Sequence, residues 1–179
     1  MENHEPPIVL VPGFLGSDSH WDVEAIRDRY QSSRFLTTHP GPLSSHHDRA
    51  CELFYSLKGG VVDYGAEHAC RCDHARFGRD EGDGAFPEWD ESHPIDLVGH
   101  SIGGVTARVL QQLLADGAFP GHATSAAWGP ASLTTLSSPH NGDPVVYALG
   151  ASASREPRPP RSSLLRRLLP AHLCAPGTA

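Results

Sequence analysis

HPIDLVGHSIGG, residues 93–104, places a serine between glycines at the point where an apolar run ends and a helical pattern begins. The run from Ile95 to Val98 predicts a short buried strand, and residues 104–115 carry alanine and leucines at helical spacing. Between a strand and a helix, G-x-S-x-G is typical of a nucleophile elbow, whose glycines leave room for a turn that lifts the serine clear. The pattern predicts Ser101 as a nucleophile; the alternative is an ordinary strand-to-helix turn.

Two backbone N–H groups are predicted to bind a developing oxyanion beside this serine. The first N–H groups of a helix have no partner within the helix, and after Ser101 the first belongs to Ile102. Upstream, an apolar run from Ile8 to Val11 ends in the loop PGFLG, which offers a second N–H at Phe14. The sequence therefore predicts an oxyanion hole formed by the N–H groups of Phe14 and Ile102.

The rest of the chain alternates strand and helix patterns as far as about residue 137. Helices are expected at 21–33, where Asp22 stands near the start, and at 48–60, where a glycine ends the pattern; further strands are expected at 35–38 and 132–137. Residues 78–92 form an acidic, glycine-containing stretch in which no regular element is expected. This order predicts an α/β fold, a mostly parallel sheet with helices on both faces.

Composition excludes some classes of protein. The formal charge of −7 over 179 residues argues against nucleic acid as a partner. No stretch approaches the roughly 18 apolar residues of a transmembrane segment, and the start MENHEPP lacks the pattern of a signal peptide. If Met1 is the true start, a cytoplasmic protein is expected. Residues 145–179 are rich in Pro, Arg and Ser and are expected to be a disordered tail. Nothing indicates the oligomeric state.

Histidine and cysteine alternate in one short segment. His68, Cys70, Cys72 and His74 stand at every second position, so in an extended chain all four would face one side. Imidazole and thiolate are the ligands that zinc prefers. The spacing favours a zinc site but leaves open a reducible cysteine pair or scattered polar loop residues.

Four blocks of sequence resemble one known family, the secreted thermostable triacylglycerol lipases of Bacillus and Geobacillus type, in the α/β-hydrolase superfamily. The blocks are GPLSSHHDRACE (41–52), GGVVDYGAEHACRCDHARFGR (59–79), GHSIGGVTARVL (99–110) and SLTTLSSPHNG (132–142). The resemblance implies an α/β-hydrolase fold in which Ser101 takes the acyl group of an acylglycerol or another ester and passes it to water. It implies that residues 1–144 are the N-terminal part of an α/β-hydrolase (lipase) domain, with a zinc-subdomain-like insertion around 45–80.

The same resemblance implies a metal site. These lipases hold a structural zinc through two histidines and two aspartates, and the matching positions are Asp48, His68 and His74. The family's fourth ligand would lie beyond this sequence, so Cys70 or Cys72 could supply it. His46 and His47 precede Asp48. Either could be an accidental ligand, but both are interpreted as solvated loop side chains.

The expected partners of a serine nucleophile are hard to find after Ser101. In this superfamily the acid and then the histidine follow the serine. The acids available are Asp116, Asp143 and Glu156, and the histidines are His122, His140 and His172. None is well placed by the pattern, and nothing matches the family's calcium site, so the fold is expected to be incomplete at the C-terminus. The alternative function is therefore an inactive α/β-hydrolase fragment that binds or regulates a partner; a zinc or thiol module is a third.

Overall fold

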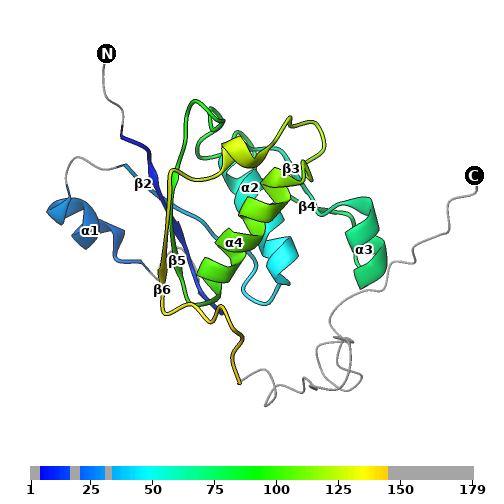
Figure 1. Ribbon diagram of the computed structural model, residues 1–179, viewed down its shortest axis with the longest axis horizontal. Helices are drawn as coiled ribbons and strands as arrows, with labels where there is room; N and C mark the ends of the chain where they lie inside the picture. Colours follow the sequence, from blue (N-terminus) through cyan, green and yellow to red (C-terminus); the bar gives the residue numbers. More distant parts are fainter. Residues whose placement is uncertain (1–4, 17–20, 31–33, 145–179) are drawn as a thin grey trace, which may run out of the picture.

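The computed structural model describes residues 5–16, 21–30 and 34–144. At its centre is a four-stranded sheet in the order β2-β1-β5-β6, and every neighbouring pair of strands is parallel (Figure 1). The strands span Ile8–Val11 (β1), Phe35–Thr37 (β2), Asp96–His100 (β5) and Ser132–Leu136 (β6). Their carboxyl ends meet at one edge, so the loop after β1 and the turn after β5 are neighbours. The predicted α/β fold is confirmed.

The two central strands, β1 and β5, lie in the middle of the sheet because their apolar side chains are buried there. Val9 and Val11 on β1 and Leu97 on β5 are fully buried, as expected for strands covered on both faces. By contrast β6, at the edge of the sheet, alternates between half-buried and exposed residues. The expected bounds of β1 are confirmed, while β5 begins one residue later and ends two residues later than its apolar run.

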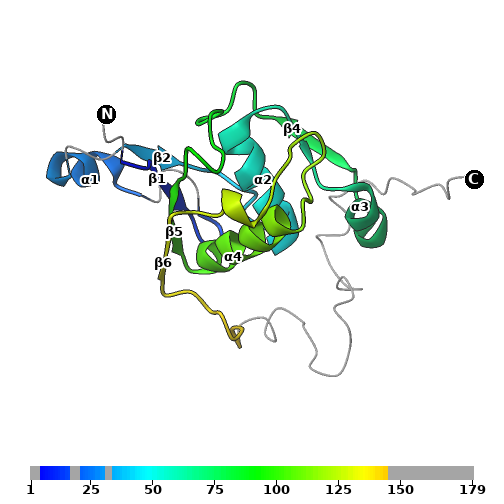
Figure 2. The same ribbon diagram turned by 45° about the horizontal axis from the view of Figure 1, so that its top comes forward.

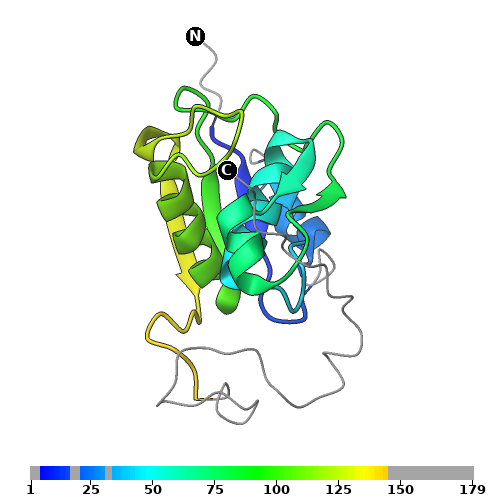
Figure 3. The same ribbon diagram turned by 90° about the vertical axis from the view of Figure 1, so that its right-hand side faces the viewer.

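Helices cover both faces of the sheet. Helices α2 (His46–Lys58) and α4 (Ile102–Ala115) lie side by side on one face, and α1 (Val23–Arg29) lies on the opposite side (Figures 1 and 2). Figure 3 shows α2 and α4 next to each other in front of the strands. Side chains just before α1 and α2 cap their first turns. Asp22 accepts a hydrogen bond from the N–H of Ala25 at 3.0 Å at the start of α1, and Ser45 accepts one from the N–H of Asp48 at the start of α2.

The predicted apolar stripes of α2 and α4 form the core. All of these side chains are fully buried: Ala50, Leu53, Phe54, Leu57, Ala107, Leu110 and Leu114. The ring of Phe54 stacks on that of Phe119, with 3.7 Å between centroids. Trp89, also fully buried, packs beside it from the long connection before β5. Each such large apolar side chain stabilises the fold by roughly 1.5–3 kcal/mol.

A small second unit lies on the side of α2 away from the sheet (Figures 1 and 2). It consists of β3 (Val61–Asp63), α3 (Ala66–Cys72) and β4 (Phe77–Asp80), with β3 and β4 antiparallel. The expectation of no regular element in 78–92 is wrong for its first three residues. All four residues of β4 are exposed, so no apolar alternation marks it, and main-chain pairing with β3 forms it instead.

Two further expectations from the sequence concern a membrane-spanning helix and the C-terminal tail. No helix in the described ranges is long and apolar enough to cross a membrane. The expected tail, 145–179, lies outside those ranges, together with Glu156 and His172.

Candidate functional site

Ser101 lies in a sharp turn between β5 and α4. Its backbone torsions, φ 54° and ψ −128°, are ones that side-chain-bearing residues rarely adopt. Such a conformation costs on the order of 1–3 kcal/mol and persists only where the surroundings impose it. Here the N–H of Ser101 donates to the carbonyl of Leu136 on β6 at 2.8 Å, and its own carbonyl accepts from Gly104. The turn therefore has the geometry that the G-x-S-x-G pattern predicts.

The flanking glycines are required by close backbone contacts. A Cβ at Gly99 would lie 2.5 Å from Cα of Gly104, and one at Gly103 would lie 2.3 Å from the carbonyl oxygen of Val11. Backbone atoms cannot move away without disrupting β1 or α4. Glycine is therefore the residue that fits at both positions.

The β1 loop, residues 12–16, packs directly against the serine. The sheet register pairs Val11 with Gly99, so the two strands deliver their following turns to the same place. A Cβ at Gly13 would lie 2.9 Å from Cβ of Ser101. Within the described ranges no acceptor pairs with the N–H of Phe14, and Ile102 is the first residue of α4. One of these two N–H groups lies in the loop that meets the serine, and the other lies at the start of the helix that follows it.

A fully buried arginine holds the β1 loop in place. Arg49, on α2, donates from Nη2 to the carbonyl of Pro12 and from Nη1 to that of Gly41, both at 2.6 Å. Its Nε donates to Oγ1 of Thr106 on α4 at 3.2 Å. One guanidinium therefore ties together the β1 loop, α2 and the helix that follows Ser101.

Three of the acids and histidines that follow Ser101 in the sequence have other contacts. Asp116 accepts from Nε2 of Gln112 at the far end of α4. His122 packs edge-on against the ring of Phe54, and His140 pairs with Oγ1 of Thr135 at 3.2 Å. Among the described residues no side chain hydrogen-bonds to Oγ of Ser101.

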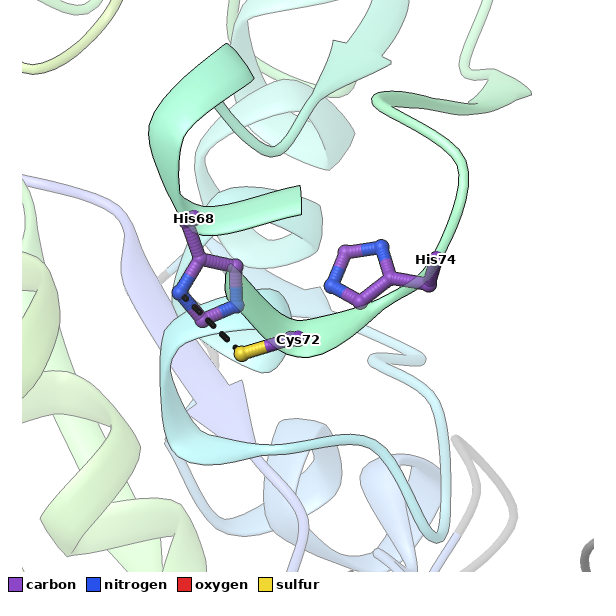
Figure 4. Close-up of side chains that lie close together, drawn as sticks. All are labelled: His68, Cys72 and His74. Atoms are coloured by element: carbon purple, nitrogen blue, oxygen red, sulfur yellow. Dashed lines mark hydrogen bonds between the residues drawn. The ribbon is translucent and has the colours of Figure 1, made fainter. Parts of the chain in front are cut away.

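The histidine and cysteine segment is helical, not extended. Because residues 66–72 form α3, His68 and Cys72 are four residues apart on one face, and His74 returns to them after the left-handed residue Asp73. The three side chains point toward one another (Figure 4), and one ligand atom of each lies within 4.8 Å of those of the other two. The four alternating residues therefore do not share one side, as they would in an extended chain: Cys70, two residues from His68, is not in this His-Cys-His group.

Asp48, predicted as a ligand, lies beside the same group. Its Oδ1 is 2.9 Å from Nε2 of His68 and 3.6 Å from Nε2 of His74. That nitrogen of His74 is buried without a hydrogen-bond partner, while Nδ1 pairs with the carbonyl of Ala75 at 2.8 Å. A bound cation would give this nitrogen a partner, and burying the nitrogen would otherwise cost free energy. Two imidazoles, a carboxylate and a thiol are also ligands that zinc accepts, so the residues fit a zinc ion.

His46 and His47 belong to the first turn of α2 and are not loop residues. The ring of His47 stacks on that of His68, with centroids 3.6 Å apart, and its Nε2 lies 2.9 Å from the carbonyl of Tyr64. Burial, followed by the neighbouring His47, lowers the pKa of His68. The neutral imidazole is the form that binds metal ions.

An ion pair between Asp63 and Arg76 joins the two ends of the segment that contains α3. The carboxylate of Asp63 accepts from Nε and Nη2 of Arg76 at 2.9 and 2.7 Å, and also from the N–H of Gly65. The hydrogen bonds from Arg76, the largest cause, hold the pKa of Asp63 below its usual value against the opposing effect of burial. The pair fixes both ends of the segment that bears His68 and His74.

A family model described as "Lipase-like, C-terminal domain" matches residues 4–155. The chain belongs to this lipase-like family. Lipase 2 of Staphylococcus aureus is 34% identical over 155 residues, which cover 79% of this lipase-like chain and 22% of that relative. The chain thus spans under a quarter of the length of this relative.

Solved lipase structures share the fold of this lipase-like domain. Lipase 1 from Pelosinus fermentans superposes with a TM-score of 0.66 at 35% identity, covering 82% of this chain and 44% of that one. The lipase of Staphylococcus hyicus gives a TM-score of 0.65 at 30% identity, covering 84% and 46%. The likeness is to bacterial lipases in general, a broader group than the Bacillus and Geobacillus type.

Sequence reasoning overlooked two residues of the lipase-like site. Arg49 occupies a position on the apolar stripe of α2, four residues before Leu53, and a charged residue in such a stripe is a sign of a buried polar contact. His47 carries no comparable signal, because its contact with His68 depends on how α3 folds back onto α2.

Proposed function

We propose that this domain provides the nucleophile of a lipase-like carboxylic ester hydrolase, with Ser101 as the attacking residue. The observation that carries the proposal is the positive φ of Ser101, 54°, together with the close packing of Gly13 of the β1 loop against this serine. A strained serine beside unpaired N–H groups is the arrangement that acyl transfer requires. The lipase names of the relatives support the same reaction class.

In the proposed reaction Oγ of Ser101 attacks the ester carbonyl carbon. The carbonyl oxygen becomes negative and accepts hydrogen bonds from the N–H groups of Phe14 and Ile102, each of which is worth on the order of 10²–10³ in rate. Breaking the C–O bond leaves an acyl group on Ser101, and the proton given up by its Oγ passes to the departing oxygen, which leaves as the alcohol. Water then attacks the acyl group, releases the carboxylic acid and regenerates the serine.

We propose acylglycerols as the substrate class. Large apolar side chains surround the serine turn: Phe14 and Leu15 in the β1 loop are 50% and 65% exposed, and Leu136, whose carbonyl binds the N–H of Ser101, is 44% exposed. Exposed apolar side chains gathered beside a reactive group favour contact with an acyl chain.

We further propose that Asp48, His68 and His74 hold a structural zinc ion, as the narrower likeness to the Bacillus and Geobacillus lipases suggests. The ion would fasten α3 to the first turn of α2. An alanine at any of the three positions should lower zinc content and melting temperature together, while His93→Ala, an exposed histidine elsewhere, should change neither. Unchanged zinc content in all three variants would refute the site.

A fluorophosphonate probe tests the nucleophile. The probe should label Ser101 in the full chain, and peptide mass mapping would identify the labelled residue. Ser92→Ala, at an exposed loop position, should be labelled like the parent chain, and Ser101→Ala should not be labelled. In ester hydrolysis, Ser101→Ala should lose activity on the order of 10⁴-fold or more with fold and zinc content unchanged. Hydrolysis at the parent rate would refute the assignment.

One observation favours a second function, that of an inactive α/β-hydrolase domain that binds or regulates a partner. In the part of the chain that the structure describes, neither His122 nor His140 contacts Ser101, and a serine without a base is a weak nucleophile. A folded, zinc-loaded chain that the probe fails to label would support this function over hydrolysis.

A further inference from the structure

Cys72 is the one cysteine of its segment that the fold brings to the two histidines. It follows His68 by one turn of α3, and its Sγ lies 3.9 Å from Nδ1 of that ring (Figure 4). The ring of His74 completes the group from the other side, with its buried Nε2 lacking a hydrogen-bond partner. The lipases that the sequence resembles use carboxylates and imidazoles, so a thiol at this place departs from the ligand types of that family.

We propose that Cys72 is a thiolate ligand of the metal ion, which makes the site a mixed one of carboxylate, imidazole and thiolate. The inference rests on the zinc site proposed above for Asp48, His68 and His74. All four residues then come from residues 48–74: one from the first turn of α2, two from α3 and one from the turn after it. The site needs no ligand from elsewhere in the chain.

The geometry allows this with one side-chain movement. In a tetrahedral zinc site with bonds of about 2.0–2.3 Å, the ligand atoms are roughly 3.3–3.8 Å apart. The nitrogens of His68 and His74 lie 2.9 and 3.6 Å from Oδ1 of Asp48, close to that range. Sγ of Cys72 lies on the Nδ1 side of His68, within 4.8 Å of the group. Because Cys72 is exposed and has a single side-chain torsion before Sγ, rotation about Cα–Cβ can turn the sulfur toward the ion.

A thiolate changes what the site binds. Carboxylate and imidazole alone also suit harder ions such as manganese, whereas a thiolate favours zinc and other softer ions. Four protein ligands leave no position open for water, so the ion would be structural and take no part in ester hydrolysis.

Cobalt substitution of the full chain tests the proposal. Cobalt(II) bound to a thiolate absorbs in the near ultraviolet through sulfur-to-metal charge transfer, and with nitrogen and oxygen ligands alone this band is absent. The parent chain should show the band. Cys72→Ser should lose it and bind zinc at least about 10-fold more weakly in competition with a chromophoric chelator, since even the outer-shell partners of metal ligands are worth about that much. The matched control is Cys51→Ala, at the other free thiol in the described ranges, which should keep both band and affinity.

The outcomes separate the two proposals. Cobalt bound without a thiolate band, or a band that persists in Cys72→Ser, would overturn the role of Cys72 while leaving the zinc site intact. A band lost in Cys70→Ser and kept in Cys72→Ser would overturn it equally. No metal binding at all would overturn both, and probe labelling of Ser101 would remain as an independent result.

Discussion

The buried guanidinium of Arg49 holds the carbonyl of Pro12 at 2.6 Å, one residue before the glycine that touches Ser101. Lysine carries the same charge but cannot reach three acceptors in different directions. Arg49→Lys should therefore leave buried carbonyls unpaired and lower the free energy of unfolding by about 1–3 kcal/mol. Urea unfolding measures this effect.

The same substitution should also slow probe labelling of Ser101, because the β1 loop loses its anchor. Arg108→Lys, an exposed position on α4, is the matched control and should leave stability and labelling unchanged. If Arg49→Lys is as stable and as reactive as the parent chain, Arg49 does not position the loop.

The turn around Ser101 should not tolerate a single added methyl group. A Cβ at Gly103 would lie 2.3 Å from a backbone oxygen of β1, so Gly103→Ala should destabilise the chain by about 1–3 kcal/mol or prevent folding. Gly129→Ala is the control, since its Cβ would meet a single carbonyl at 3.1 Å. Thermal unfolding followed by circular dichroism compares the two. Equal melting temperatures would contradict the close approach of α4 to β1.

The pair between Asp63 and Arg76 should stabilise the chain in a pH-dependent way. The pKa of Asp63 is lowered on folding, so its contribution is fully present above its unfolded value of about 3.9 and is lost as pH falls through the folded value. Asp63→Asn should melt a few degrees below the parent chain at pH 7, and the difference should shrink below about pH 4. A gap that widens on acidification would contradict this sign.

Arg76→Gln supplies the matching half of a double-mutant cycle. Once Asp63 is replaced, removing Arg76 should cost little more, because the two side chains act through each other. Strictly additive losses would mean that the two residues stabilise the segment independently.

The two free thiols among the described residues should differ in reactivity. Burial raises the pKa of the Cys51 thiol to about 12, and its side chain is 3% exposed, whereas Cys72 is exposed. In the metal-free chain, iodoacetamide at pH 8 should therefore alkylate Cys72 and spare Cys51 until the chain unfolds, because the thiolate is the reactive form. Trypsin cleavage at Arg71 separates Cys72 from Cys70 for mass mapping. Rapid native alkylation of Cys51 would show that α2 opens more readily than its packing suggests.

The sheet and its two covering helices were predictable because each has a strong periodic signal. The apolar run of β1 and the stripes of α2 and α4 are confirmed, and Gly59, with φ 87°, ends the second helix as the pattern predicts. The serine turn was predictable for a related reason: glycines at 99 and 103 are required by local contacts within the strand and helix that the motif itself identifies.

Helix α3 was not predictable in the same way. It has seven residues and no side-chain cap, and its buried residues are His68 and Ala69, so it has no apolar stripe. The alternation of histidine and cysteine looked like a strand, although the residues that meet are four apart. The residue types suggested a possible metal-ligating group, but which cysteine lies beside the two histidines depends on the helical turn.

Asp48 and Arg49 are consecutive on α2, and neighbouring residues on a helix point about 100° apart. The first residue faces the His-Cys-His group and the second faces the loop beside Ser101. One turn of backbone therefore fastens two places that are separate in the fold. If that turn frays, amide protons in the β1 loop and in α3 should begin to exchange with solvent together, as one local opening event.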